Sequence, residues 1–324
     1  MEHKTSRSTT GLWTGRDFTR FSCKQTAHEM ASAYRTDTEV VKPATGPAPP
    51  LSTMSKVETT KIRKREVVSE LREHILIVTI NRPQSRNALN RNAIYDLIAA
   101  FADATYNKDI KVVVLTGCGD IFSAGNDLKQ IQDYPSPEDY FYGANYILKS
   151  LIKSVLVCPK LTVCLVNGPC IGIGFTLAAL CDLVYCSRAA YFHTPFSQLG
   201  LCAEACSSYT FPQLFGTSWA SKLLMLGEKL TAEQAHQFGF VVELYDSQQE
   251  VQEKFWPKMH EYTRLPYESL HATKQLMRLH RQPQLLKALD EELKQIAKLR
   301  QGPVYRRAIE EFSKKSKSIN KSKL

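Results

Sequence analysis

The chain has 324 residues, 43% hydrophobic and 23% charged, with a formal net charge of +10. This composition is typical of a globular protein of one or two domains, and 15 glycines and 15 prolines exclude a collagen-like or wholly disordered chain. No apolar run approaches the roughly 18 residues needed to cross a bilayer, so we expect no membrane span. The nine cysteines are an odd number and lie mostly in apolar segments, which indicates a reducing compartment without a disulfide framework.

The positive charge lies at the two ends of the chain. Residues 1–65 carry 12 Lys and Arg against 6 Asp and Glu, and residues 313–324 carry five lysines and no acid. The segment between them is therefore close to neutral. A protein that reads nucleic acid carries its basic stripe on the folded body, so we expect no nucleic-acid partner.

Four regions follow along the chain. Residues 1–58 are rich in Ser, Thr, Ala and Pro without sustained periodicity, which predicts a flexible leader. The leader is basic enough to leave a second, mitochondrial location open, although its acids argue against a presequence. We predict a folded core over 59–265, a helical C-terminal region over 266–313 and a basic tail over 314–324.

Apolar runs alternate with helical periodicity from about residue 65 onward. The runs 75–80, 112–117, 161–166, 182–186 and 240–244 predict strands, and each of the first three leads through a loop toward a helical segment. Asn90 is the predicted N-cap of a helix with Leu97 and Phe101 on its apolar face. The chain from about Tyr267 is predicted to be helical. Strands alternating with helices predict an α/β fold with functional loops at strand ends.

Several common motifs are absent. Gly172 and Gly174 follow a strand, but Leu177 stands where the dinucleotide fingerprint needs its third glycine. Cys202 and Cys206 lack a second ligand pair at zinc spacing, so we expect no metal site. His193 is interpreted as a hydrogen-bonded structural histidine rather than a base.

Two loops rich in small residues remain, at 122–128 and 167–174. Each follows a strand and leads toward a helical segment, where first-turn amides have no partner within the helix. Two such amides directed at one point make an oxyanion hole. The glycines are equally compatible with tight turns alone, and the spacing leaves both interpretations open.

The motifs taken together identify a family. They are Asn81-Arg82-Pro83, Arg86-Asn87-Ala88-Leu89, Phe122 to Leu128, Asn167-Gly168-Pro169 with Gly172, Cys181 to Tyr185 and Gly227 to Ala235. In order and spacing they resemble the enoyl-CoA hydratase/isomerase (crotonase) superfamily over about residues 66–315. The resemblance implies a ClpP-like right-handed spiral of ββα units with a helical C-terminal region that forms trimers. It also implies an acyl-CoA substrate whose thioester oxygen lies between two backbone amides.

Site residues carry over from the resemblance by position. The two amides would belong to Ala124 and Ile173. The residues facing the substrate and its coenzyme A would be Ser85, Arg86, Ala88, Leu89, Ala124, Gly125, Asn126, Asp127, Leu128 and Gly172. Coenzyme A is part of the substrate in this family, so no separate cofactor is expected.

The acids present indicate the subfamily. Hydratases of this superfamily place glutamates where this chain has Thr176 and Phe196, and neither residue moves a proton. Glu204, with its flanking sequence, resembles the single catalytic glutamate of peroxisomal Δ3,Δ2-enoyl-CoA isomerases, which act in β-oxidation of unsaturated fatty acids. One base suffices to take a proton from C2 and return one to C4, and an apolar pocket would strengthen Glu204 as that base.

Two features depart from the isomerase pattern. Ala203 and Ala205 replace the Pro and Gly that usually flank the glutamate, and Ala205 would be strained if its φ is positive. The N-terminal acyl-CoA-binding domain that relatives often carry has no counterpart in residues 1–58, which are too short and too polar.

Two other functions stay open. One is a catalytically silent acyl-CoA-binding or interaction module such as those of chromodomain-Y-like proteins, and the other is a hydratase. The final Ser322-Lys323-Leu324 matches the peroxisomal import signal and predicts import-receptor binding and a matrix location.

Overall fold

The computed structural model describes residues 65–133, 141 and 143–311. The predicted leader and the basic tail, including Ser322, Lys323 and Leu324, lie outside the described residues. In the described ranges no helix is both long and apolar enough to span a bilayer.

The strands lie between residues 67 and 245. They are β1 (Val67–Arg72), β2 (Ile75–Ile80), β3 (Val112–Gly117), β4 (Leu161–Val166), β5 (Cys170–Ile171), β6 (Leu183–Ser187), β7 (Tyr191–His193), β8 (Lys229–Thr231) and β9 (Glu243–Tyr245).

Helices fill most of the connections and the C-terminal region. The α-helices are α2 (Arg91–Tyr106), α4 (Ala144–Val157), α5 (Ile173–Ala178), α6 (Ser207–Leu224), α7 (Ala232–Gln237), α8 (Gln248–Glu250), α9 (Trp256–Arg264), α10 (Tyr267–Leu279) and α11 (Gln282–Arg300). Residues 303–311 are also helical, and the shorter turns are η2 (Pro83–Ser85), η3 (Leu128–Asp133), η4 (Ser197–Leu199) and η5 (Val251–Phe255).

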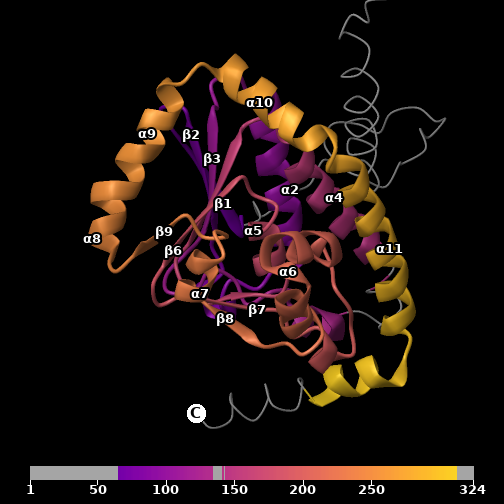
Figure 1. Ribbon diagram of the computed structural model, residues 1–324. Coiled ribbons are helices and arrows are strands. Elements are labelled where there is room, and N and C mark those ends of the chain that lie inside the picture. Colours follow the sequence, from indigo (N-terminus) through magenta and orange to yellow (C-terminus); the bar gives the residue numbers. More distant parts are fainter. Residues whose placement is uncertain (1–64, 134–140, 142, 312–324) are drawn as a thin grey trace, which may run out of the picture. The chain divides into compact units, whose positions relative to one another are not determined.

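Six strands form the main sheet in the order β1-β2-β3-β4-β6-β9 (Figure 1). β1 runs antiparallel to β2, and the other neighbouring pairs are parallel. In the parallel part, Ile77 pairs with Val114 and Val114 with Val163. Parallel strands covered on both faces are continuous apolar runs, which is why the pattern of the sequence located β2, β3 and β4.

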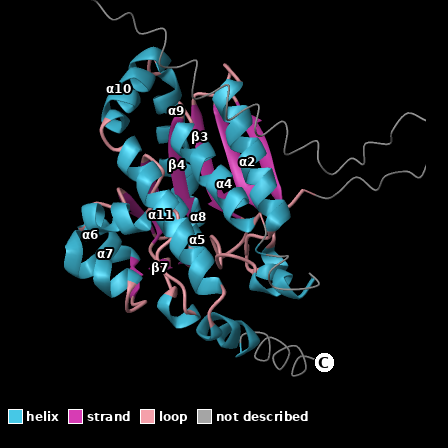
Figure 2. Ribbon diagram, turned by 90° about the vertical axis from the view of Figure 1, so that its right-hand side faces the viewer, coloured by secondary structure: helices cyan, strands magenta, loops and turns pink. Residues whose placement is uncertain are grey.

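Alternate residues of the strands pack on opposite sides of the sheet. Ile77, Val114 and Val163 belong to a core shared with Phe255 of η5 and Met259 of α9. Helices α2 and α4 lie together against the strands in Figure 2, on the other side of the sheet from α9 in Figure 1. Because both faces are buried, the sheet is a rigid support for the loops at its strand ends.

A smaller sheet of order β5-β7-β8 and a cluster of aromatic rings support the second glycine loop. Phe175 of α5 has its ring centroid 4.9 Å from that of Phe192, 4.6 Å from that of Phe211 and 5.5 Å from that of Phe240. These contacts join α5, β7 and α6 into one apolar unit. The start of α5 and the start of α6 are thereby held relative to each other.

Most predicted elements are confirmed, with one correction and one omission. Asn90 caps α2 by accepting the N–H of Ala93 at 2.8 Å, as predicted. The strand predicted at 240–244 is wrong in its bounds, because Phe240 and the residue after it donate their amides to the carbonyl of Ala235 and close α7. β9 starts only at Glu243. β1 was not predicted, since Val67 is its one buried residue.

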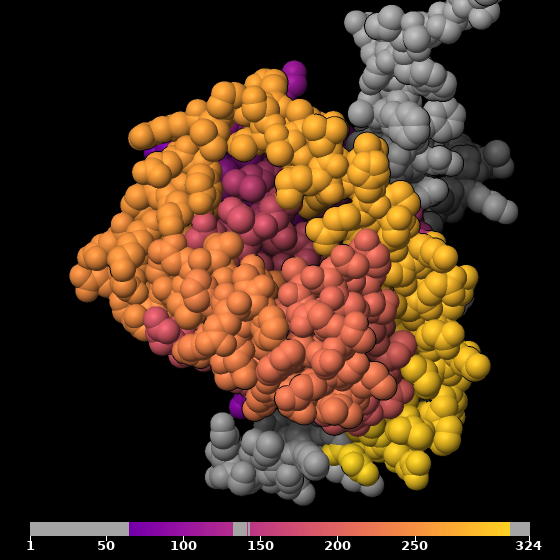
Figure 3. All heavy atoms as spheres, viewed as in Figure 1, coloured from indigo at the N-terminus to yellow at the C-terminus, as the bar shows by residue number. Residues whose placement is uncertain are grey.

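The C-terminal region is helical from Tyr267 onward, as predicted. Helix α10 buries none of its residues. Helix α11 buries Leu285, Leu289, Glu292, Leu293 and Ile296 and contacts both α4 and α6. In the space-filling view these helices, orange to yellow, follow the margin of the visible face (Figure 3).

Candidate active site

Glu204 lies in the loop that leads from η4 into α6. Its side chain is buried, with 4% of the residue exposed. The amide Nδ2 of Asn126, in the first glycine loop, lies 3.4 Å from Oε1 and 3.5 Å from Oε2 of Glu204. The predicted base is therefore brought against the first glycine loop, 78 residues away in the chain.

Burial dominates the electrostatics of Glu204. Loss of hydration raises the pKa of its carboxyl from 4.5 to about 7. The positive charge of Arg300 lowers this pKa, the negative charge of Glu292 raises it, and the hydrogen bond from Asn126 lowers it. A carboxyl with a pKa near neutrality both accepts and returns protons readily at physiological pH.

The other two buried carboxylates of the described chain are already engaged. Asp127 accepts a hydrogen bond from Nη1 of Arg82 at 2.9 Å. Glu292 of α11 accepts the backbone N–H of Cys206 at 2.7 Å and that of Ser208 at 2.8 Å. Among the described residues, the carboxylate of Glu204 has hydrogen-bond contacts only with Asn126, and these are long, which leaves it available for proton transfer.

The two glycine loops touch backbone to backbone. The N–H of Ile171 donates to the carbonyl of Ser123 at 2.9 Å. A Cβ on Gly125 would lie 3.1 Å from the carbonyl oxygen of Ile171 and 3.6 Å from Cα of Gly172, and both glycines have positive φ, 89° and 55°. Glycine is required at both positions by conformation, and at Gly125 by the close approach as well.

Two amides at this junction are unpaired. Ile173 is the first residue of α5, where an N–H has no partner within the helix, and within the described ranges no other acceptor reaches it. The N–H of Asn126 is likewise without an acceptor in the described part of the chain. Pairing explains this, since Leu89 bonds to Gly125 and Asp127 on either side of Asn126, and the N–H of Asn126 then points away from that partner.

The prediction that the amide of Ala124 is free to bind the thioester oxygen is wrong. Its N–H donates to the carbonyl of Arg86 at 3.0 Å and is not free to bind a ligand oxygen. The free amide is that of Asn126, two residues later, because Leu89 pairs with Gly125 and Asp127 on either side of it. Sequence reasoning had no access to this partner, because the contact joins two segments that are far apart in the chain.

The residues predicted to face the substrate lie in three segments, the third being Gly172 in the second glycine loop, next to Gly125. Ser85 ends η2, Arg86 is exposed at a left-handed turn with φ 52°, and Ala88 and Leu89 are buried. Leu89 bridges to the first loop, which holds the predicted residues Ala124, Gly125, Asn126, Asp127 and Leu128. The carboxylate of Asp127 forms an ion pair with Arg82, so it stabilises the contact between the segment around Arg82 and the first loop.

Asn87 belongs to the motif Arg86-Asn87-Ala88-Leu89, but the sequence analysis did not predict its role in holding the site together. It is fully buried with φ 55° and donates from Nδ2 to the carbonyls of Cys118 at 2.9 Å and Ile121 at 2.7 Å. Its Oδ1 accepts the N–H of Arg82 at 3.0 Å. The signal available was chemical, because asparagine is the residue other than glycine that best tolerates a left-handed turn.

A largely apolar cavity opens beside Asn126. It is lined by Arg91, Ile94, Asn126, Leu128, Phe141, Ala144, Ile147, Leu148, Leu201, Arg300 and Tyr305. Arg300 lies over the ring of Phe141 at 4.9 Å and donates to Oδ1 of Asn145 at 2.8 Å. An apolar lining with few polar groups suits a hydrocarbon chain whose polar end reaches Asn126.

The two positions where hydratases of the superfamily place glutamates hold no acid in this chain. Thr176 is buried and donates its hydroxyl to the carbonyl of Ile173 at 3.3 Å, and Phe196 is 4% exposed. His193 contacts the carbonyl of Gly227 through Nε2 at 2.9 Å, which agrees with its interpretation as a structural histidine.

The turn after Glu204 is left-handed, as suspected from the missing glycine. Ala205 has φ 55° and Cys206 has φ 66°. Each non-glycine residue in this conformation costs about 1 to 2 kcal/mol. The surrounding contacts must therefore hold this turn in place.

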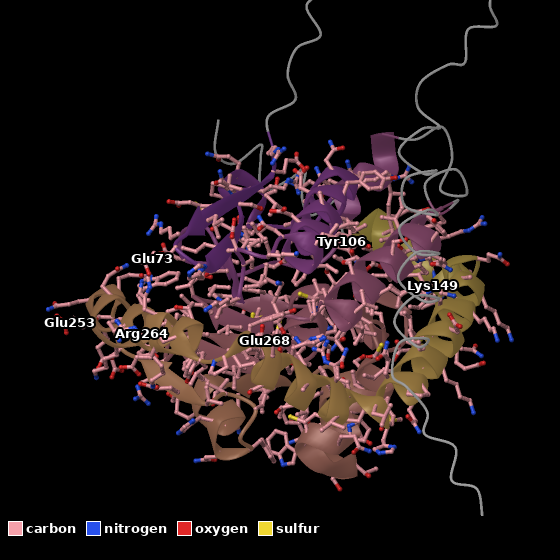
Figure 4. The ribbon with its side chains drawn as sticks, turned by 90° about the horizontal axis from the view of Figure 1, so that it is seen from above. Glu73, Tyr106, Lys149, Glu253, Arg264 and Glu268 are labelled. Carbon is pink, nitrogen blue, oxygen red and sulfur yellow. The ribbon has the colours of Figure 1, made fainter. Side chains whose placement is uncertain are left out.

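A second cavity, of about 570 Å³, lies between the β1–β2 turn and α9. Figure 4 shows two of its lining residues, Glu73 and Arg264, on one side of the molecule and Lys149 of α4 toward the other. Three of its polar side chains have partners within the lining: Glu73 contacts His260 at 3.0 Å and Lys111 donates to the carbonyl of Thr263 at 2.7 Å. It contains no member of the Glu204 site.

Comparison with known proteins gives consistent matches. The family model described as Enoyl-CoA hydratase/isomerase matches residues 70–322. Enoyl-CoA delta isomerase 2 of Rattus norvegicus is 37% identical over 66% of this chain and 55% of the relative. Enoyl-CoA delta isomerase 3, peroxisomal, of Mus musculus is 33% identical over 76% of this chain and 78% of the relative. The chain thus spans little more than half the length of the rat protein.

A solved structure has the same arrangement of elements. It is an enoyl-CoA hydratase/isomerase from Pseudoalteromonas atlantica T6c, 29% identical, with a TM-score of 0.70 over 77% of this chain and 97% of the solved chain.

Proposed function

The chain belongs to the enoyl-CoA hydratase/isomerase family, and we propose that within it the chain is a Δ3,Δ2-enoyl-CoA isomerase acting on cis- or trans-3-enoyl-CoA. The predicted crotonase-type α/β fold with a helical C-terminal region is confirmed. The product is trans-2-enoyl-CoA, and the reaction belongs to β-oxidation of unsaturated fatty acids. The names of the rat and mouse relatives support this choice.

One observation carries the proposal. Glu204 is the buried carboxylate of the described chain that forms no ion pair and accepts no backbone amide, and it lies against Asn126, whose own N–H is unpaired. The second unpaired amide, of Ile173, belongs to the loop that touches Gly125. A proton acceptor beside two free donors is what transposition of a double bond α to a thioester needs.

The reaction uses these groups in two steps. The carboxylate of Glu204 takes a proton from C2, and the C2–H electron pair forms the C1=C2 bond as the C=O electrons of the thioester move onto its oxygen. In the intermediate dienolate the negative charge rests on the thioester oxygen, where the amides of Asn126 and Ile173 stabilise it. Glu204 then delivers the proton to C4, which is bonded by the C3=C4 electrons as the C1=C2 pair moves to C2=C3 and the thioester carbonyl re-forms, so no atom is gained or lost. Coenzyme A enters and leaves as part of the substrate, and the reaction needs no other cofactor.

The alternatives are weaker on the same residues. A hydratase needs acid and base positions to activate water, and the residues there are Thr176 and Phe196. A silent binding module has no need for a buried, ionisable glutamate, which destabilises the fold at neutral pH. Retention of Glu204 therefore favours catalysis.

Assembly and location extend the proposal. We infer a homotrimer formed through the C-terminal helices, supported by Leu276, Met277 and Leu279 of α10, which are 69%, 69% and 58% exposed. We infer a peroxisomal matrix location reached through an import receptor that binds Ser322-Lys323-Leu324, supported by the name of the mouse relative.

The test is conversion of 3-enoyl-CoA to trans-2-enoyl-CoA by the purified chain, with acyl-CoA binding and 3-hydroxyacyl-CoA formation measured in parallel. We expect Glu204→Gln to lower kcat by about a thousandfold or more while binding is kept. Glu291→Gln is the matched control, because Glu291 is exposed on α11 and its ion-pair partner among the described residues is Lys294. Its kcat should equal that of wild type.

Two results would reject the proposal. Binding of acyl-CoA without turnover by wild type would indicate the silent module. Formation of 3-hydroxyacyl-CoA from trans-2-enoyl-CoA at a rate above isomerisation would indicate a hydratase.

A further inference from the structure

Helix α11 contacts the Glu204 loop from a segment almost 90 residues further along the chain. Glu292 is 5% exposed, and its two carboxylate oxygens accept the N–H of Cys206 and of Ser208. Both oxygens act as acceptors, which an ionised carboxylate satisfies fully. The thiol of Cys206 also donates to the carbonyl of Leu285 in the first turns of α11, at 3.3 Å.

These bonds hold the turn that presents the base. Ala205 and Cys206 are left-handed, and the carbonyl of Glu204 itself accepts the N–H of Ser207 at 3.1 Å. Without an external acceptor, the amides at the start of α6 would be buried and unpaired, and the strained turn would relax. A relaxed turn would move the carboxylate of Glu204 away from Asn126.

Arg300 is the last residue of the same helix, and its positive charge acts on Glu204. It lies against Phe141 and Asn145 and lines the cavity that also contains Asn126. Its Nε is buried without an acceptor in the described part of the chain. A partly unpaired guanidinium at the wall of an apolar cavity places a positive charge close to the base.

We propose that Glu292 and Arg300 of α11 are positioning residues for Glu204. Glu292 holds the left-handed turn that presents Glu204, and Arg300 places its positive charge at the wall of the cavity beside it. This inference rests on the proposed isomerase function for its catalytic consequence, but its geometric and electrostatic part does not depend on turnover.

The electrostatics of the site support the pair. The titratable groups that face Glu204 are Arg300 and Glu292 of α11 and the thiol of Cys202 in its own loop, whose pKa burial raises, with Glu292 and Glu204 adding to the rise. Arg300 lowers the pKa of Glu204 and Glu292 raises it. Neutralising Glu292 should therefore lower the pKa of Glu204, and neutralising Arg300 should raise it.

The experiment titrates Glu204 directly by NMR of protein labelled with ¹³C at glutamate carboxyls, the signal being assigned by its loss in Glu204→Gln. We expect the midpoint to fall in Glu292→Gln and to rise in Arg300→Gln, each by about 0.5 pH unit or more. Glu291→Gln, one residue from Glu292 and exposed, should leave it unchanged. Arg300→Lys keeps the charge and should restore most of the wild-type midpoint.

Kinetics separates position from charge. Glu292→Asp keeps the negative charge but is one methylene too short to reach both amides, so we expect kcat to fall by roughly a hundredfold with KM little changed. The acid limb of kcat/KM should follow the NMR midpoint in Glu292→Gln and Arg300→Gln. Circular dichroism shows whether each variant folds, and Arg300→Gln tests the inference if the Glu292 variants do not.

The inference fails if the Glu204 midpoint is the same in Glu292→Gln, Arg300→Gln and wild type, or if folded Glu292→Asp keeps the wild-type kcat. An inactive wild type whose midpoint still moves in opposite directions rejects the isomerase function and supports the placement of Glu292 and Arg300. The two failures are therefore distinguishable.

Discussion

Neutralising the buried base should stabilise the protein while abolishing its activity. Burial raises the pKa of Glu204 from 4.5 to about 7. Because protons bind the folded state more tightly, stability falls as pH rises from 4.5, where the unfolded chain ionises, to about 7, where the folded chain ionises too. Above pH 7 the penalty is constant, and at about 1.4 kcal/mol per pH unit it reaches about 3 kcal/mol.

The assay is urea unfolding of wild type and Glu204→Gln at pH 5 and pH 8. Glutamine fills the same volume without a charge, and any cost of burying its amide is the same at both pH values. The stability advantage of Glu204→Gln over wild type should therefore be larger at pH 8 than at pH 5, by about 2 to 3 kcal/mol. Glu291→Gln, which removes an exposed carboxylate from α11, should show no comparable gain.

Two outcomes would refute this reasoning. An advantage of Glu204→Gln that is equal at pH 5 and pH 8 would mean that the carboxyl is hydrated in solution. If Glu204→Gln is instead less stable than wild type at pH 8, the ionised carboxylate of Glu204 forms a stabilising ion pair in solution.

Three further predictions concern the frame of the site. Asn87→Ala leaves the carbonyls of Cys118 and Ile121 without their donor and should lower the free energy of unfolding by about 2 to 4 kcal/mol in urea titration, whereas an effect below 1 kcal/mol would show that water replaces the side chain. Gly125→Ala puts a Cβ 3.1 Å from the carbonyl oxygen of Ile171 at φ 89° and should reduce kcat at least tenfold, which an unchanged kcat would contradict. Asp182→Asn removes the carboxylate that pairs with both Lys274 and Arg278 of α10, and thermal unfolding should show that the free energy of unfolding falls by about 3 kcal/mol or more. A much smaller loss would show that the two cations move into solvent.

Local patterns in the sequence were sufficient for the central strands of the sheet, whereas the choice of Glu204 as the base came from the family resemblance and stays a prediction. The runs at 75–80, 112–117 and 161–166 are strands because both faces of a parallel sheet are covered, so apolar character is continuous and visible without knowledge of neighbours. Glycines in two loops and a glutamate in place of hydratase acids were visible in the same way. The strain at Ala205 followed from the residue type and the expected turn.

Only the tertiary structure decided which groups act together. Ala124 and Asn126 are two residues apart and equally plausible as donors in the sequence, and the carbonyl of Arg86 occupies one amide and leaves the other free. Glu292 gives no local signal on an amphipathic helix, yet it holds the turn that presents Glu204. The physical reason is that periodicity and turn chemistry act between near neighbours in the chain, whereas hydrogen-bond partners and the hydration of a charge depend on segments that meet only after folding.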